Sequence, residues 1–161
     1  MPRALLLALV SALLALGLLA GCGDDGGKGD DKAELKEAFD RDYPPINDEF
    51  VALGNETGET IKTAKGKSNA ELATKFESLA TRVDGLKRRL DALEPPPEYE
   101  ADTKRLSAVM GVVSGDLKEI SQAATAGDAA EARTQVQELA RHSVEVRTAR
   151  RALARKTGAK V

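Results

Sequence analysis

The chain has one cysteine, one histidine and no tryptophan, and only 3% of its 161 residues are aromatic. In an exported protein a single cysteine cannot form an internal disulfide, so its thiol is free, linked to another chain or modified. These counts also exclude most zinc sites and a haem held by two imidazoles. The few aromatic side chains offer little surface on which nucleic-acid bases could stack. We therefore expect neither a metal nor a cofactor.

An excess of charge of one sign is lacking as well, since the net charge is −2 although 31% of the residues are charged. This balance argues against a general nucleic-acid-binding protein, which is expected to be basic. The apolar residues are mostly Ala, Leu and Val, set among Glu, Lys and Arg, and residues typical of strands are few. Such a composition is typical of long helices.

Residues 1–21 have the pattern of a secretory leader. A positive end with Arg3 precedes an apolar run from Ala4 to Ala20, which only Ser11 and Gly17 interrupt. The run is slightly short for a transmembrane helix, which needs about 20 apolar residues. Small residues close it, as in a cleavable signal peptide.

The leader ends in Leu19-Ala20-Gly21-Cys22, which resembles the bacterial lipobox. In that motif the thiol is joined to diacylglycerol and the leader is cut just before the cysteine. The resemblance implies that Cys22 becomes the first residue of a lipoprotein anchored outside the cytoplasmic membrane. Its amino group is then either left free or given a further acyl chain, such as palmitate, and two or more chains anchor a protein stably. A plain signal peptide and an uncleaved anchor are the alternatives.

Three further parts follow the leader. Residues 22–32 are rich in Gly and Asp, which favour neither helix nor strand, so we expect a flexible acidic tether. Residues 33–157 are long enough for one domain with its own core. Residues 158–161 are expected to be a disordered tail.

The clearest helix of this domain is predicted from Ser68 to Leu93. Ser68 and Glu71 have the spacing of a capping box, in which each side chain accepts a hydrogen bond from the other residue's backbone. Three prolines, 95–97, end the pattern because they lack the N–H that a helix needs. Apolar residues recur at steps of four and three, which predicts one buried face in a coiled-coil-like register: Leu72, Phe76, Leu79, Val83, Leu86, Leu90 and Leu93.

Two more helices are predicted from about 98 to 126 and from 128 to about 155. Gly127 suits a left-handed C-cap, and Asp128 can cap the next helix. The expected core of the first is Tyr99, Leu106, Val109, Val113, Leu117 and Ile120, widened by Met110 and Val112. The expected core of the second is Ala132, Val136, Leu139, Val146 and Leu153. The short connections require consecutive helices to run antiparallel.

The first segment of the domain is weaker. Residues 32–41 look helical, but Pro44 and Pro45 are expected to interrupt the helix before an apolar stripe resumes at Ile46. Gly54 and Gly58 cost about 1 kcal/mol each in a helix interior, and they either allow close approach of another helix or mark fraying. We predict an all-α, antiparallel up-down-up-down four-helix bundle with a kinked, weaker first helix. A three-helix core with a loose arm is the alternative.

Residues 68–157 resemble the helical part of uncharacterised small lipoproteins of high-GC Gram-positive bacteria. The shared features are a Leu stripe ending in Leu93-Glu94-Pro95-Pro96-Pro97, a helix leading to Ala126-Gly127-Asp128, and an Arg-rich last helix. The resemblance implies no activity.

Two features of the last helix are candidates for function. His142 has Glu138 four residues before it and Glu145 three after it, but we expect it to hydrogen-bond a neighbouring helix at the edge of the core rather than to hold a metal. Arg147, Arg151 and Arg155 form a ladder at steps of four. The ladder is either a patch for anionic lipid headgroups or wall polymers, or a solvated face that complements the helix dipole.

No motif for a nucleophile, a phosphate-binding loop or a metal appears, so we expect no catalytic site and no enzyme. The sequence favours a non-enzymatic lipoprotein of the cell envelope, a structural element or one that binds another envelope protein, with no nucleic-acid partner. The alternative is a carrier or sensor that holds a small or lipidic ligand between the helices. That function needs a cavity, whereas the narrow stripes predict tight packing.

Lipidation at Cys22 predicts that Cys22→Ser leaves an unlipidated precursor with its leader attached. Metabolic labelling of cells with a fatty-acid analogue measures this directly. Equal incorporation of label by the variant and the unchanged chain would contradict the prediction.

Overall fold

The computed structural model describes residues 27–161. The predicted leader, the lipobox, Cys22 and the first residues of the tether therefore lie outside the described residues. Four helices make up most of this part: α1 (Gly27–Lys62), α2 (Asn69–Asp91), α3 (Pro97–Ala126) and α4 (Ala129–Thr157), with a short 3-10 turn, η1 (Ala64–Gly66). No strand occurs in residues 27–161. The predicted all-α four-helix bundle is confirmed.

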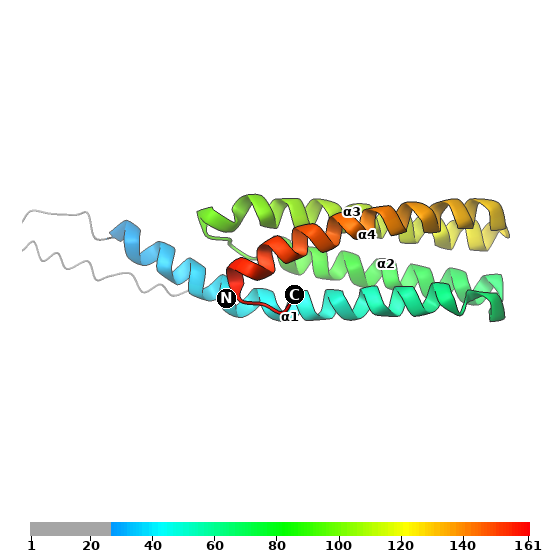
Figure 1. The fold of residues 1–161 in the computed structure, drawn as a ribbon, viewed down its shortest axis with the longest axis horizontal. Coiled ribbons are helices and arrows are strands. Elements are labelled where there is room, and N and C mark those ends of the chain that lie inside the picture. The colour runs from blue at the N-terminus through cyan, green and yellow to red at the C-terminus, as the bar shows by residue number, and fades with distance from the viewer. Residues whose placement is uncertain (1–26) are drawn as a thin grey trace, which may run out of the picture.

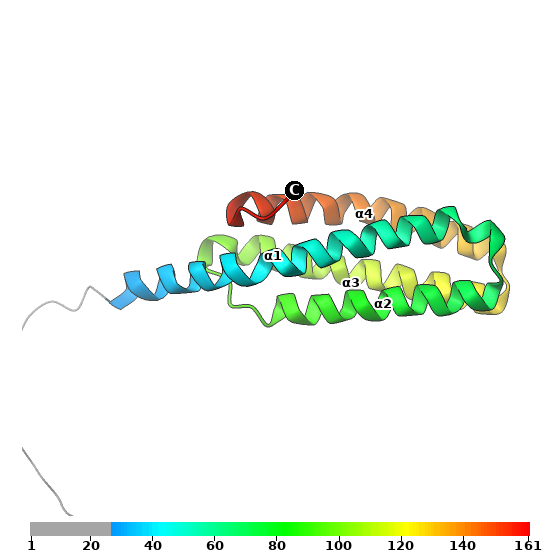
Figure 2. The same ribbon diagram turned by 90° about the horizontal axis from the view of Figure 1, so that it is seen from below.

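The helices lie side by side in an elongated bundle (Figures 1 and 2). Each of α2, α3 and α4 begins at the end of the bundle where the preceding helix stops. Among neighbours, α2 packs most extensively on α3 and α3 on α4, while α1 contacts α2 and, more sparsely, α4. We call the end with the α1–α2 and α3–α4 connections the far end. The near end holds the α2–α3 connection and the C-terminus. The first turns of α1 project beyond it (Figure 1).

The helix ends form at the residues that the sequence indicates. Glu71 accepts a hydrogen bond from the backbone N–H of Ser68 at 2.8 Å while Ser68 Oγ accepts one from that of Glu71, so the capping box is present. Pro97 is the first residue of α3, where its fixed φ is already helical. Gly127 ends α3 with φ 71°, and Asp128 then accepts hydrogen bonds from two backbone N–H groups of α4.

Helix α1 differs from the expectation, because it runs without interruption through Pro44 and Pro45. The prolines remove two backbone donors, but the buried side chains of Phe39, Tyr43 and Ile46 hold this stretch against the bundle. The ribbon of α1 changes direction between its projecting turns and its packed part (Figure 1). Since Leu53 is also buried, α1 belongs to the bundle and is not a loose arm.

The boundary of the predicted tether was also wrong, since residues 27–32 are the first turns of α1. Acidic residues near a helix N-terminus interact favourably with its dipole, and Asp31 stands in the second turn. The reading that Gly54 and Gly58 allow close approach of another helix is wrong, and the two glycines do not interrupt α1. A Cβ at either position would meet nothing within 4 Å, so no helix approaches closely, and α1 continues through both.

The core follows the predicted stripes. In α2 the middle five stripe residues are buried and Leu72 and Leu93 are partly buried. Val112 was wrongly assigned to the core, since it is 44% exposed. It lies about 200° around the helix from buried Met110, on the solvent side. Every buried core residue of the described part lies between Phe39 and Ala159, so residues 27–161 contain a complete hydrophobic core.

The near end is closed by aromatic rings and by the C-terminal residues. The ring of Phe39 stacks on Tyr43 and meets Tyr99 edge-on, both with centroids 5.6 Å apart. The predicted disordered tail, 158–161, was wrong. Gly158 ends α4 with φ 73°, Ala159 is buried, and the carbonyl of Lys160 accepts hydrogen bonds from Asn47 and Arg150 at 3.1 and 3.2 Å.

Removing a core side chain of α2 should destabilise the bundle. We expect Leu79→Ala or Leu86→Ala to lower the free energy of unfolding by about 2–5 kcal/mol, because each leaves a cavity in a packed core. The measurement is thermal or denaturant unfolding of residues 27–161, followed by circular dichroism. Glu77→Ala is the control, since Glu77 is exposed on the same helix, and its effect should stay within about 0.5 kcal/mol. Equal effects of core and control variants would contradict this register.

Candidate functional site

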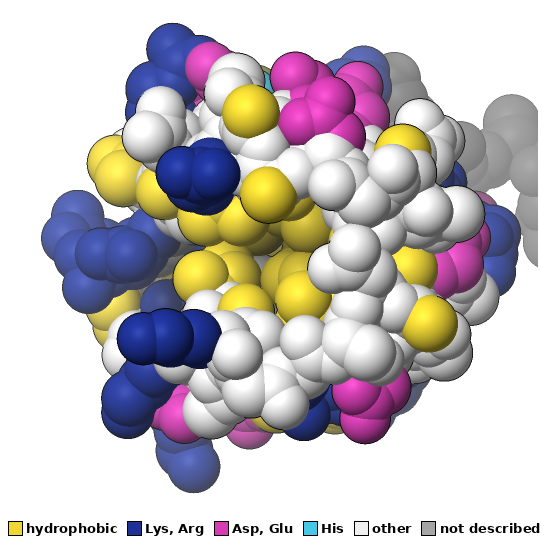
Figure 3. Space-filling model, turned by 90° about the vertical axis from the view of Figure 1, so that its right-hand side faces the viewer, with side chains coloured by type: hydrophobic (Ala, Val, Ile, Leu, Met, Phe, Trp, Pro, Cys, Tyr) yellow, Lys and Arg dark blue, Asp and Glu magenta, His cyan; other side chains and the backbone are white. Residues whose placement is uncertain are grey.

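The far end of the bundle holds an apolar hollow of about 370 Å³. All four helices and η1 contribute to it, and the lining is Ile61, Ala64, Leu72, Phe76, Ile120, Ala124, Ala132, Arg133, Val136 and Gln137. Viewed from this end, hydrophobic side chains gather in a central depression, with Lys and Arg side chains along one side (Figure 3). The hollow is thus an opening into the core between the helices.

Small side chains leave this space unfilled. Ala64, Ala124 and Ala132 face it from three different elements, where the near end has the rings of Phe39, Tyr43 and Tyr99. Three larger apolar residues of the lining, Ile61, Leu72 and Val136, are only partly buried although they pack against the core. Apolar surface that remains in contact with water gains free energy when a ligand covers it, by about 25 cal/mol per Å².

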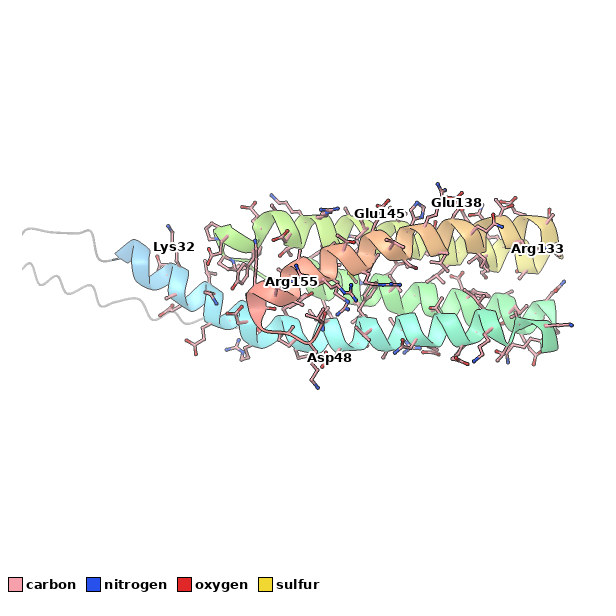
Figure 4. The ribbon with its side chains drawn as sticks, in the orientation of Figure 1. Lys32, Asp48, Arg133, Glu138, Glu145 and Arg155 are labelled. Carbon is pink, nitrogen blue, oxygen red and sulfur yellow. The ribbon has the colours of Figure 1, made fainter. Side chains whose placement is uncertain are left out.

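Two polar side chains, Arg133 and Gln137, belong to the lining. Both come from α4, and Figure 4 places Arg133 at the far end of the bundle. The Nε of Arg133 donates a hydrogen bond to the carbonyl of Ala129 at 2.8 Å. Within residues 27–161 the guanidinium forms no ion pair, so its remaining N–H groups have no carboxylate to bind.

A second hollow, of about 310 Å³, lies beside the α2–α3 connection and is lined by Lys87, Leu90, Asp91, Leu93, Pro95, Thr103, Lys104, Ser107 and Ala108. Its charged rim is engaged within the protein. Lys87 pairs with Asp91 at 2.5 Å, and Lys104 pairs with Glu100 at the same distance. These contacts leave it less suited to a ligand than the far hollow.

The histidine is confirmed as a contact between helices. Its Nδ1 donates to Oδ2 of Asp116 on α3 at 2.7 Å, since a carboxylate only accepts. The Asp116 side chain is 8% exposed, so this bond satisfies a nearly buried carboxylate. The neighbouring Glu138 pairs with Arg141 instead. Among residues 27–161 no group of three or more His, Cys, Asp or Glu is placed to hold a metal ion.

The arginine ladder lies on the outside of α4. Arg147, Arg151 and Arg155 are all exposed, and no ion pair to them is found within the described range. They occupy the half of α4 that ends at the near end of the bundle, where Figure 4 labels Arg155. Both readings of the ladder, an anionic-surface patch and a solvated face, fit this placement.

Another arginine of α4, Arg150, was not predicted to be buried. Arg150 is only 9% exposed and donates to Oδ1 of Asn47 on α1 at 3.0 Å and to the Lys160 carbonyl. The hydroxyl of Tyr43 is buried beside this group without a hydrogen-bond partner, and burial raises its pKa. The sequence did carry a signal: Arg150 is four residues after Val146 and three before Leu153, on the core face.

No family model, no curated protein and no solved structure matches this chain. Of the helices in residues 27–161, none is long and apolar enough to cross a membrane. The choice of a function therefore depends on the residues of the chain itself. Because the far hollow is the largest apolar opening described above, it is the candidate functional site.

If the arginine ladder is an anionic-surface patch, residues 27–161 should bind vesicles rich in anionic lipid at low salt. Binding should fall steeply towards 0.15 M salt, where exposed charges are screened beyond about 8 Å. Replacing Arg147, Arg151 and Arg155 with Gln should abolish the binding in a sedimentation assay.

The matched control replaces three other exposed arginines, Arg88, Arg105 and Arg141, with Gln, so that the net charge changes equally. We expect this control to retain most of the binding. Equal losses in both triple variants, or no binding at low salt, would identify the ladder as a solvated face.

Proposed function

We propose that the protein is a lipid-anchored extracytoplasmic lipoprotein that binds an apolar ligand in the hollow at the far end of its helical bundle. The observation that carries the binding function is the opening of about 370 Å³ into the hydrophobic core. Pockets that hold small ligands typically have volumes of about 300–1,000 Å³, so this hollow is at the lower end of that range. Its lining of apolar side chains with two polar groups also suits such a ligand.

This proposal favours the carrier or sensor over a structural role. Narrow Leu, Val and Ala stripes predict tight packing along the whole bundle, and tight packing would leave no place for a ligand. The far end departs from that expectation because its lining alanines do not fill the space between the helices. The role as a structural element or a binding partner of an envelope protein remains the second candidate, supported by the long, charged outer surface.

The anchor at Cys22 rests on the lipobox-like residues alone. If it is correct, it gives the hollow an orientation, because α1 begins on the anchored side. Its 36 residues extend over about 54 Å, and Ile61 of the hollow lies in its last turn. The hollow then lies at the end of the bundle opposite the anchored end, and ligands outside the cytoplasmic membrane can reach it.

The proposed function involves no chemical step. The one histidine is engaged with Asp116, and the lining of the hollow contains no Ser, Cys, His, Asp or Glu. A pocket of this composition can bind and release a ligand, with burial of apolar surface as the driving force. The absence of an enzyme activity and of a cofactor stays a prediction.

A neutral naphthylamine dye that fluoresces in apolar surroundings tests the binding function. Residues 27–161 should enhance its fluorescence in a saturable manner, with one dye bound per chain. Ala132→Leu should abolish the enhancement, because the larger side chain fills the hollow while alanine and leucine have similar helix propensities.

The matched control is Ala140→Leu, which makes the same change at an exposed position of the same helix. It should bind the dye like the unchanged protein, and circular dichroism should show equal helix content in all three. Absence of dye binding, or equal binding by both variants, would show that the hollow is not a ligand site.

A further inference from the structure

The polar side of the hollow is cationic. Arg133 is exposed at its rim on α4, and its Nε is held by the Ala129 carbonyl. This bond fixes one edge of the guanidinium and leaves the other N–H groups without a protein acceptor among the described residues. A planar guanidinium with unoccupied donors matches the geometry of a carboxylate or a phosphate.

In the chain segments near the hollow, cationic and acidic side chains are equal in number, but the side chains without a partner are cations. The segments 59–71 and 128–133 contain the cations Lys62, Lys65, Lys67 and Arg133 and the acids Glu59, Glu71, Asp128 and Glu131. All four acids already have partners: Glu59 pairs with Lys62, Glu71 and Asp128 cap helices, and Glu131 accepts from Gln135. Lys65, Lys67 and Arg133 form no ion pair within residues 27–161. Within these two segments an anion would therefore meet unpaired cations and no unpaired carboxylate.

From this arrangement we propose that the ligand of the hollow is an anionic amphiphile with a single hydrocarbon chain. The chain occupies the apolar interior between Phe76, Ile120 and Val136, and the anionic head binds the guanidinium of Arg133. This inference rests on the proposed function, because it names the ligand class of the same hollow.

The size of the hollow favours one chain of medium length. A volume of about 370 Å³ is near the lower end of the range for small-ligand pockets, so a two-chain phospholipid would not be enclosed. Each methylene group that leaves water contributes about 0.8 kcal/mol. The chain therefore supplies most of the affinity, and the head determines which amphiphile binds.

The test compares three ligands with the same twelve-carbon chain in displacing the neutral dye from residues 27–161, with the anions below their micelle-forming concentrations and the alcohol below its solubility limit. They are dodecanoate, dodecyl phosphate and dodecanol. We expect both anions to displace the dye at roughly tenfold lower concentration than the alcohol. One charge-assisted hydrogen bond at a partly exposed rim contributes about this factor to the affinity. The two anions distinguish a carboxylate from a phosphate head.

Variants of the rim identify the residue that binds the head. Arg133→Gln should remove the advantage of the anions without changing dye binding, and Arg133→Lys should retain part of it. Arg105→Gln is the control, since Arg105 is an exposed arginine of α3 that forms no ion pair within residues 27–161 and lies outside both the lining of the hollow and the arginine ladder.

Each outcome has a separate meaning. If the dye binds but dodecanol competes as well as the anions, or if Arg133→Gln leaves their advantage unchanged, the hollow binds apolar groups without regard to charge and this inference is wrong. If an amphipathic peptide displaces the dye and no amphiphile does, the occupant is a protein segment and the inference is also wrong. If the dye itself does not bind, the proposed function fails.

Discussion

Four packed helices keep a nearly constant distance between their axes, so the side chains that face the centre must fill a similar space at every level of the bundle. At the near end Phe39, Tyr43 and Tyr99 meet this requirement, with ring centroids 5.6 Å apart. At the far end Ala64, Ala124 and Ala132 do not, and the hollow is the space that they leave. The location of the candidate site thus follows from the uneven distribution of large side chains along one bundle.

The same unevenness appears in how α1 is held against α4. Contacts between these two helices are sparse, and they include a hydrogen bond between Arg150 and Asn47 towards the near end. Arg150 there is nearly buried and binds Asn47 and the Lys160 carbonyl, with no carboxylate partner in residues 27–161. Burying a guanidinium is costly unless its hydrogen bonds are made. The C-terminal residues supply one of the acceptors, which explains why they are ordered.

The sequence was sufficient for those parts of the fold that depend on local rules. The capping box of Ser68, the C-cap of Gly127 and the heptad stripe of α2 each follow from the spacing of a few neighbouring residues. It was insufficient where tertiary packing decides. Pro44 and Pro45 lie within a continuous helix because buried neighbours hold it, and the tail is ordered by residues more than 100 positions away in α1.

The candidate site was harder to predict for the same reason. Leu72, Phe76, Ile120, Ala132 and Val136 of the hollow lie on stripes that also predict a filled core. Periodicity alone does not show whether side chains of unequal volume fill the space between the helices. Arg133 carries no local signal, since one arginine in the first turns of a charged helix is ordinary. It differs from the other arginines of α4 only because it lies at the far end, where five elements line the hollow.

Among the helices that line the hollow, α1 packs least extensively on its neighbours. Its second half contains Gly54 and Gly58, each of which costs about 1 kcal/mol in a helix interior. Helix α3 packs on α2 and on α4 more extensively than α1 packs on either of them. The wall that α1 forms therefore has the least support from packing, whereas the near end holds α1 in place through its rings and the Arg150 contacts.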